Sequence, residues 1–116
     1  MNGLPTVTAE RGHADHRELD LLVAADNPWF EGHFPGLPIL PGVVQIGWAV
    51  HFAGAVCGFE GGVSALEQVK FKRPIRPGAR LTLHLKPDAA TRKLRYEFRD
   101  AEFTYSSGTL NFGPAA

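Results

Sequence analysis

The chain has 116 residues, of which 44% are hydrophobic and 21% charged, and its twelve basic and twelve acidic side chains cancel. This length suits a single domain, here residues 1–116, and this composition excludes collagen-like, disulfide-rich and wholly disordered chains. Cys57 is the sole cysteine, so no disulfide can form within one chain. The first residues, MNGLP, lack the features of a signal peptide, and we expect a cytoplasmic protein.

Basic residues are concentrated in the second half of the sequence. Residues 70–99 contain ten Lys or Arg against two Asp or Glu, a net charge of +8, whereas residues 1–69 contain two against eight, a net charge of −6. A basic segment on a neutral protein favours a local anionic partner over general nucleic-acid binding. Solvated strand faces would give the same pattern.

In the first third of the chain, the sequence predicts one strand and otherwise irregular structure. Residues 1–13 show weak periodicity, which is typical of a loose terminus or a short edge strand. Residues 16–25 alternate enough to form a strand with one solvent-facing side, and the following Asp-Asn-Pro ends it. Residues 29–40 contain repeated prolines and are predicted to form a long, stiffened loop.

A helix and four strands are predicted after this loop. Pro41 suits a helix entrance, and residues 43–57 are almost entirely apolar over about four turns. Small and polar interruptions make this run a buried helix rather than a membrane span. Strand-like runs follow at residues 63–72, 80–86, 92–99 and 102–112. This order predicts an α+β fold, an antiparallel sheet curled around one central helix.

A histidine on a stiff loop precedes this helix. The glycines and proline of segment 32–36 are expected to hold the His33 imidazole in place, with Phe34 as an apolar wall. The Gly42 and Val43 amides at the helix start would polarise a carbonyl. A base beside such a carbonyl suits removal of a proton from the adjacent carbon. A structural histidine and an ordinary Pro-Gly turn are the alternatives.

Two segments resemble one enzyme family. Residues 30–43, FEGHFPGLPILPGV, and residues 69–78, VKFKRPIRPG, look like the signature segments of the hot-dog-fold 3-hydroxyacyl-acyl-carrier-protein dehydratases of fatty-acid synthesis. The resemblance covers residues 16–113. The sequence LPGVVQ, followed by Trp48, is most similar to a branch associated with aryl-polyene pigment synthesis.

The resemblance implies a hot-dog fold and a homodimer whose two sheets join into one, with acyl tunnels at the subunit interface. It implies that His33 removes the C2 proton of an acyl-phosphopantetheine substrate on acyl-carrier protein. It further implies that the Gly42 amide holds the thioester carbonyl. The Val43 amide and Phe34, from the helix start and the histidine loop, are the other candidate substrate-binding groups. No cofactor is implied.

The helix lacks the family's second catalytic group. That group is a Glu or Asp five residues after the glycine, where this chain has Gly47. A positioned general acid contributes about 10²- to 10⁴-fold in rate. His51, one turn later on the same face, is the best replacement, although it would instead suit a hydrogen bond to a backbone carbonyl. Gln45, roughly opposite on the helix, and Glu31, an expected exposed loop charge, are weaker substitutes.

Three functions therefore stay open. Dehydration of a 3-hydroxyacyl thioester to a 2-enoyl thioester, in fatty-acid or polyene biosynthesis, is the leading hypothesis. The second is a non-catalytic or weakly catalytic acyl-binding subunit, for example the partner of an active paralogue. The third is thioester hydrolysis. Four basic residues would suit docking of an acidic carrier: Lys70, Lys72, Arg73 and Arg76.

The other notable side chains are predicted to be structural. Aromatic residues of the helix and the next strand are expected in the core, with an acyl channel as the alternative that they would line together with Phe34: Trp48, Phe52 and Phe71. Cys57 is expected to be an inert, buried thiol. Three further histidines have no ligand-like spacing, and no metal site is predicted from them: His13, His16 and His84.

Overall fold

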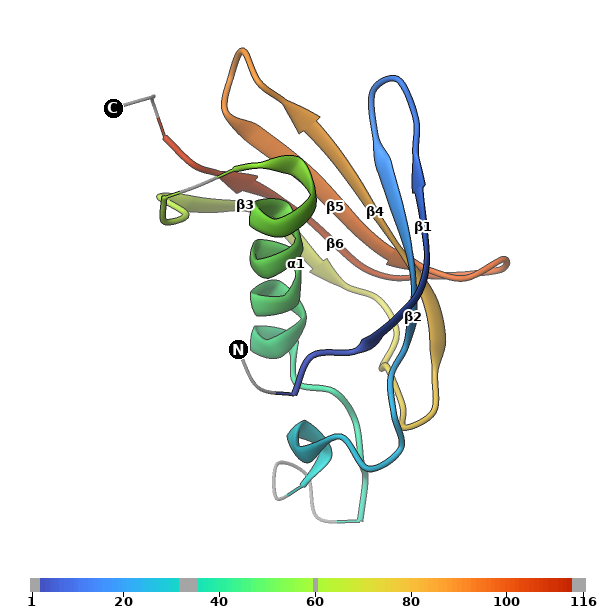
Figure 1. Ribbon diagram of the computed structural model, residues 1–116. Coiled ribbons are helices and arrows are strands. Elements are labelled where there is room, and N and C mark those ends of the chain that lie inside the picture. The colour runs from blue at the N-terminus through green and yellow to red at the C-terminus, as the bar shows by residue number, and fades with distance from the viewer. Residues whose placement is uncertain (1–2, 32–35, 60, 114–116) are drawn as a thin grey trace.

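The computed structural model of the chain describes residues 3–31, 36–59 and 61–113. An antiparallel sheet of six strands curls around one helix, α1 (Figure 1). The strand order across the sheet is β1-β2-β4-β5-β6-β3, so β1 and β3 form its two edges. This arrangement confirms the predicted α+β hot-dog fold. The strands are β1 (Thr6–Gly12), β2 (Arg17–Leu22), β3 (Ala65–Phe71), β4 (Arg80–Asp88), β5 (Lys93–Arg99) and β6 (Thr104–Asn111).

Helix α1 (Gly42–Cys57) lies in the concave side of the sheet (Figure 1). It ends at Gly58, whose φ of 73° is left-handed and readily adopted by glycine. One stripe of the helix is buried: Val44, Gln45, Trp48, Ala49, Phe52 and Ala53. Truncating a buried aromatic such as Trp48 to alanine costs about 3–5 kcal/mol, so this stripe fixes the helix against the sheet.

The sheet supplies the other half of the core through two-residue alternation. Alternate residues along most of β2, β4 and β5 are almost fully buried and belong to the same core as the helix stripe. Leu83 at the centre of β4 and Phe98 on β5 are both 0% exposed, and they face each other across the ladder. The intervening residues of these strands are more exposed. This pattern is the amphipathic alternation from which the strands were predicted.

Strand β1 is regular although its residues are all exposed. It pairs with β2 from Thr6 to Gly12, with a register shift between Val7 and Ala9. Arg11 donates two 2.8 Å hydrogen bonds to the Asp20 carboxylate, and Thr82 of β4 donates a third at 2.9 Å. These bonds hold the pKa of Asp20 down at about 2. Of the two alternatives for residues 1–13, the edge strand is therefore correct for this part.

A second stripe of α1 is apolar but only half buried. Its members recur at helical spacing: Val43, Ile46, Gly47, Val50, His51 and Gly54. Val43, at the start of this stripe, is 76% exposed. The described residues thus cover one side of the helix, whereas the sequence predicted cover on most sides. In the described parts of the chain, no helix combines the length and apolarity that a bilayer crossing requires.

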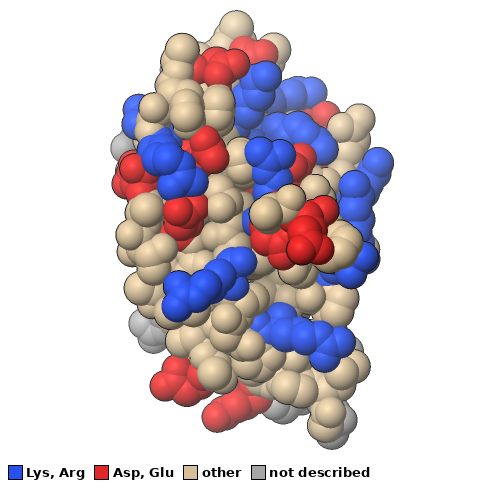
Figure 2. Space-filling view, turned by 90° about the vertical axis from the view of Figure 1, so that its right-hand side faces the viewer, with Lys and Arg blue, Asp and Glu red and all other residues tan. Residues whose placement is uncertain are grey.

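Ion pairs divide the basic residues into two groups. On β5, Lys93 pairs with Glu67 of β3 at 3.0 Å and Arg99 with Glu97 at 3.5 Å. Figure 2 shows acidic and basic side chains interspersed over the face on the right-hand side of Figure 1. In contrast, several exposed cations form no ion pair with any described residue. Three of them, Lys70, Lys72 and Arg76, lie close together in sequence, and others include Arg17, Arg80 and Arg95. One group of unpaired positive charge therefore lies at the end of β3 and in the turn after it.

Candidate functional site

The start of α1 carries two backbone donors with no helical acceptor. Pro41 is the N-cap; it offers no side-chain hydrogen bond, and the first turn contains no acidic residue. The N–H groups of Val44 and Gln45 donate to the Pro41 carbonyl at 3.1 and 3.2 Å. The N–H groups of Gly42 and Val43 precede any such acceptor and lie at the positive end of the helix dipole. This end of the helix can polarise a carbonyl oxygen.

Gly42 lies directly against the ring of Phe71, at the end of β3. A β-carbon at position 42 would be 2.7 Å from the Phe71 Cζ atom and 2.9 Å from Cε1. Real β-carbons do not approach a ring so closely, so glycine is what permits this contact. Phe71 is 53% exposed. It forms a wall beside the helix start, and its predicted place in the core is wrong.

A pocket of about 410 Å³ opens at this junction. The loop before α1 and the end of β3 form its walls. Two sets of backbone hydrogen bonds hold these two segments in place. Leu40 N–H donates to the Ile75 carbonyl at 2.8 Å, and the Lys72 and Arg73 N–H groups both donate to the Tyr105 carbonyl. The lining residues are Ile39, Leu40, Gly42, Gln45, Phe71, Lys72, Arg73 and Pro74.

Two of the four predicted docking cations border this pocket. Lys72 is exposed at its rim. The Arg73 guanidinium lies 3.5 Å from the centre of the Phe103 ring, a cation–π contact that fixes its position. Lys70 and Arg76 do not line the pocket. The site is thus apolar inside and cationic at one rim.

The structure describes only one of the two histidines proposed as catalytic. His33, together with Phe34, lies outside the described residues. His51 is half buried, one turn after Gly47, with its ring edge-on to Phe52 at 5.0 Å between centroids. It makes no hydrogen bond with any residue that the structure describes, so the predicted alternative of a backbone carbonyl partner is not found among them.

The structure places neither of the weaker substitutes for the helix acid in a catalytic position. Gln45 is 3% exposed, and its Nε2 donates to the Leu40 carbonyl at 3.2 Å. Its Oε1 is buried without a partner in the described parts of the chain. Glu31 is exposed, as predicted, at the end of a short 3-10 helix (Pro28–Phe30). Neither side chain is a free acid directed at the helix start.

The remaining sequence predictions are mostly confirmed. Trp48 is 0% and Phe52 6% exposed, and both belong to the core. Cys57 is partly buried, and burial raises the pKa of its thiol, as expected for an unreactive cysteine. The pocket role of Phe71 depends on a contact between residues 29 positions apart, and no local pattern signals such a contact.

Comparison with known proteins identifies the family. The sequence model of the ApeI-like family, described as ApeI dehydratase, matches residues 9–109. The chain belongs to the ApeI-like dehydratase family. This membership confirms the resemblance to hot-dog dehydratases that the two sequence segments indicated.

Solved structures resemble this ApeI-like chain over nearly its whole length. A chain of the dehydratase heterocomplex ApeI:P from Xenorhabdus doucetiae superposes with a TM-score of 0.85 at 32% identity, covering 92% of this chain and 96% of that one. An uncharacterized protein from Erwinia carotovora subsp. atroseptica gives a TM-score of 0.83 at 35% identity, covering 96% and 97%.

A likeness over part of the chain connects it to FabZ. The 3-hydroxyacyl-[acyl-carrier-protein] dehydratase FabZ of Rhizobium rhizogenes is 37% identical over 70 residues, which are 54% of this chain and 45% of that enzyme. The chain thus spans about half the length of the FabZ proteins that it matches.

Proposed function

We propose that this ApeI-like protein eliminates water from a 3-hydroxyacyl thioester on acyl-carrier protein and releases a 2-enoyl thioester, in fatty-acid or polyene synthesis. The observation that carries this proposal is the pocket at the start of α1. There the Gly42 amide, which has no helical acceptor, lies beside the apolar wall of Phe71 and the cationic rim of Lys72 and Arg73, and the Val43 amide follows it in the first turn. The names of the ApeI and FabZ relatives support the same chemistry.

The reaction would use these groups in a fixed order. The thioester carbonyl oxygen accepts a hydrogen bond from the Gly42 amide, which stabilises the negative charge that develops there. His33 takes the C2 proton, and the electron pair of that C–H bond forms the C2=C3 double bond. The C3–OH bond breaks, and the hydroxyl leaves as water after gaining one proton. His51 is the proposed donor of that proton, because Gly47 places no side chain one turn before it.

The basic rim suits the carrier part of the substrate. A phosphopantetheine arm carries a negative phosphate, and acyl-carrier proteins are acidic. Lys72 has no described anionic partner and lies at the pocket rim, where it would attract such a ligand. Lys70 and Arg76 would extend the same positive surface away from the pocket.

We also propose that two chains pair through the β3 edge. Strand β3 has only β6 as a neighbour, and Leu66 and Phe71 on it are 48% and 53% exposed. A second copy paired there would continue the sheet and would cover part of the half-buried stripe of α1. Burial of these apolar groups favours association.

A weakly catalytic subunit is the second candidate function. Gly47 favours this candidate, because a glycine stands at the position where the family has a catalytic Glu or Asp. The related chain from Xenorhabdus doucetiae is part of a dehydratase heterocomplex, which makes pairing with a related active chain a concrete form of this candidate. Thioester hydrolysis has no specific observation in its favour.

A turnover assay separates these functions. Purified protein would be given 3-hydroxyacyl-acyl-carrier protein, and both the enoyl product and the free acid would be measured by mass spectrometry. We expect enoyl product from the wild type and a loss of about 10²- to 10⁴-fold in both His33→Ala and His51→Ala. Val56→Ala, a matched change in the last turn of the same helix, should retain activity.

Each other result would contradict a specific part of the proposal. Turnover that His51→Ala leaves unchanged would remove His51 from the mechanism. Absence of turnover, with the substrate still bound, would favour the binding subunit. Free acid in place of enoyl product would identify a thioesterase.

A further inference from the structure

The β1–β2 hairpin brings together two histidines and a glutamate far from the α1 pocket. His13 follows β1, and its N–H donates to the His16 carbonyl at 2.9 Å, which closes the hairpin. Glu18 lies two residues further on, in β2. One potential ligand atom from each of these three side chains lies within 4.8 Å of the other two. Sequence spacing gave no reason to group these residues, whereas the hairpin does.

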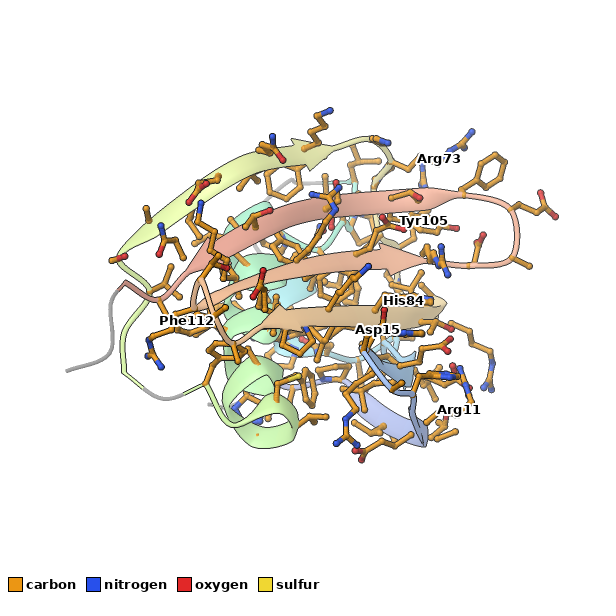
Figure 3. The ribbon with its side chains drawn as sticks, turned by 90° about the horizontal axis from the view of Figure 1, so that it is seen from above. Arg11, Asp15, Arg73, His84, Tyr105 and Phe112 are labelled. Atoms are coloured by element: carbon orange, nitrogen blue, oxygen red, sulfur yellow. The ribbon has the colours of Figure 1, made fainter. Side chains whose placement is uncertain are left out.

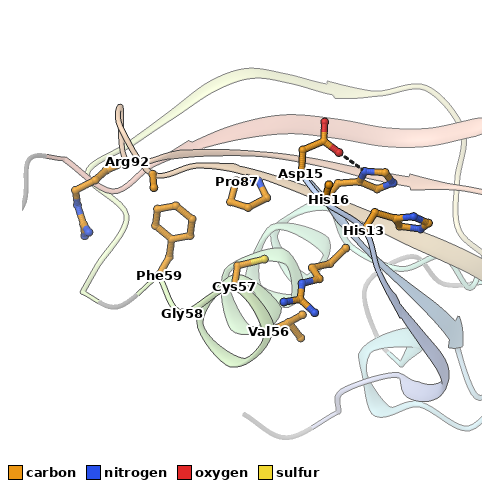
Figure 4. Close-up of a pocket in the computed structure, with 12 residues that line it drawn as sticks. His13, Asp15, His16, Val56, Cys57, Gly58, Phe59, Pro87 and Arg92 are labelled. Carbon is orange, nitrogen blue, oxygen red and sulfur yellow. Dashed lines mark hydrogen bonds and ion pairs between the residues drawn. The ribbon is translucent and has the colours of Figure 1, made fainter.

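The three side chains converge on one carboxylate oxygen. Glu18 Oε1 lies 2.5 Å from His13 Nε2 and 3.7 Å from His16 Nε2. The two imidazole rings are stacked, with centroids 4.2 Å apart and planes inclined by 11° (Figure 4). Both rings therefore turn the same nitrogen toward Glu18.

Outer hydrogen bonds orient these ligands. Asp15 Oδ1 lies 2.8 Å from His16 Nδ1, the contact dashed in Figure 4. A carboxylate only accepts, so His16 donates from Nδ1 to Asp15. The other ring nitrogen, Nε2, faces Glu18 Oε1 at 3.7 Å and is the atom that would bind a metal. A histidine held by a carboxylate at its far nitrogen is the arrangement common at metal sites.

His84 supports the second oxygen of the same glutamate. It lies opposite Glu18 in the β2–β4 ladder, with Nε2 3.6 Å from Glu18 Oε2 and Nδ1 3.3 Å from Arg99 Nη2. An arginine only donates, so His84 accepts at Nδ1 and carries its proton on Nε2, toward the glutamate. Figure 3 shows His84 and Asp15 on the same side of the molecule. Such outer partners are typical of metal sites.

We propose that His13, His16 and Glu18 bind a zinc ion. Two imidazoles and a carboxylate are a ligand set that Zn²⁺ takes, and hard cations such as Ca²⁺ and Mg²⁺ prefer oxygen alone. Tetrahedral zinc at its usual bond lengths holds neighbouring ligand atoms about 3.3 Å apart. The present distances of 2.5 and 3.7 Å bracket that value. His13 is 42% and His16 32% exposed, which leaves both rings free to adjust.

The surroundings define the rest of the site. Arg11 lies 3.5 Å from Glu18 Oε2 and would weaken cation binding, but Asp20 neutralises it through two hydrogen bonds. A cavity of about 440 Å³ borders the cluster on the side of His13, Asp15 and His16 and extends to the end of α1 (Figure 4). It gives solvent access to the fourth position on zinc, which water would occupy.

Zinc titration of tag-free protein tests the site. We expect calorimetry to show one zinc ion bound per chain. Affinity should fall at least about tenfold in His13→Ala, His16→Ala and Glu18→Gln, and by about 10- to 100-fold in Asp15→Asn, which removes an outer partner. His51→Ala is the matched control, since it removes a histidine outside the cluster and should bind zinc as the wild type does.

A second measurement does not depend on the folding of any variant. In the wild type, the imidazole nitrogen resonances of His13 and His16 should shift during the first equivalent of zinc, while those of His51 should not. Absence of zinc binding to the wild type would overturn the proposal. Binding that persists in both histidine variants, or that is lost equally in His51→Ala, would also overturn it.

Discussion

The ring of Phe71 fills the space where a side chain at Gly42 would begin, 2.7 Å from the ideal β-carbon position. This contact joins the end of β3 to the start of α1. It makes the shape of the pocket sensitive to one methyl group, although an alanine at position 42 would keep the backbone N–H that we assign to carbonyl binding.

We therefore expect Gly42→Ala to displace Phe71 and to lower kcat/KM by about 10- to 100-fold through misplacement of the thioester. The double variant Gly42→Ala, Phe71→Ala should recover part of that loss, because the ring would no longer collide. Steady-state kinetics on the four proteins of this cycle measure the coupling. If Gly42→Ala lowers kcat/KM equally in the wild-type and Phe71→Ala backgrounds, the contact does not shape the site.

The second prediction concerns the cationic rim. Lys72→Glu should raise KM for the carrier-bound substrate by about three- to tenfold at low salt and leave kcat nearly unchanged. The effect should shrink as ionic strength rises, because salt screens exposed charges. Arg95→Glu, the same charge change on the exposed side of β5, is the matched control. An equal effect in a short thioester without carrier would exclude docking as the cause.

The third prediction concerns assembly. Leu66→Lys places a charge on the β3 edge and should convert dimers to monomers in sedimentation equilibrium, since an edge lysine opposes strand pairing. Val7→Lys makes the same kind of change on β1, where Val7 is 42% exposed and Leu66 on β3 is 48% exposed. Dissociation by Val7→Lys alone would place the interface at the other edge.

The fourth prediction concerns the residue that replaces the family carboxylate. In the His51→Ala background, Gly47→Glu should restore at least about tenfold in turnover, because it supplies a carboxylic acid one turn away. Gly47→Gln fills the same volume and cannot give up a proton, so it should restore nothing. Equal recovery with glutamine would mean that space, not proton transfer, limits the variant.

The fifth prediction concerns acid stability. The Asp100 carboxylate accepts the Tyr105 hydroxyl at 2.5 Å and the N–H groups of Glu102 and Phe103 at 2.8 Å each. These bonds, that of Tyr105 foremost, lower the pKa of Asp100. A lowered carboxyl pKa stabilises the fold above the unfolded-state pKa of about 3.9, and this contribution disappears as pH falls through the folded-state pKa.

Asp100→Asn should therefore lower the free energy of unfolding at pH 7, and its difference from the wild type should shrink in acid. Urea unfolding at several pH values measures this difference. Asp88→Asn, a change at another hairpin, is the comparison, since the Asp88 carboxylate accepts only the N–H groups of Ala90 and Thr91 among described residues. A difference that stays constant from pH 7 to pH 3 would contradict the assignment.

Most of the secondary structure was predictable because burial follows sequence periodicity. The apolar run at residues 43–57 gave α1 within one residue of its observed start. Strands β4 and β5 alternate buried and exposed residues, and the sequence shows that alternation directly. Strand β1 has no buried face, so its sequence carries no such pattern, and its pairing with β2 depends on backbone bonds and on Arg11 with Asp20.

The candidate site was predictable only where its parts are contiguous in sequence. The adjacent residues Pro41 and Gly42 are a local sequence signal for a helix start. The Phe71 wall and the grouping of Glu18 with His84 depend instead on strand register, which pairs residues 66 positions apart (84 minus 18). A one-residue slip of β2 would turn Glu18 to the opposite face and would disperse that cluster.

The strand order also sets the distance between the two edges of the sheet, and so the size of the proposed dimer. β1 and β3 are separated by five inter-strand steps, about 24 Å along the sheet at the usual spacing. If two chains join through β3, their hairpin clusters lie at opposite ends of a twelve-stranded sheet. A paramagnetic metal bound to each cluster would then act as a pair of terminal markers, and the distance between them would report how strongly the joined sheet is curled.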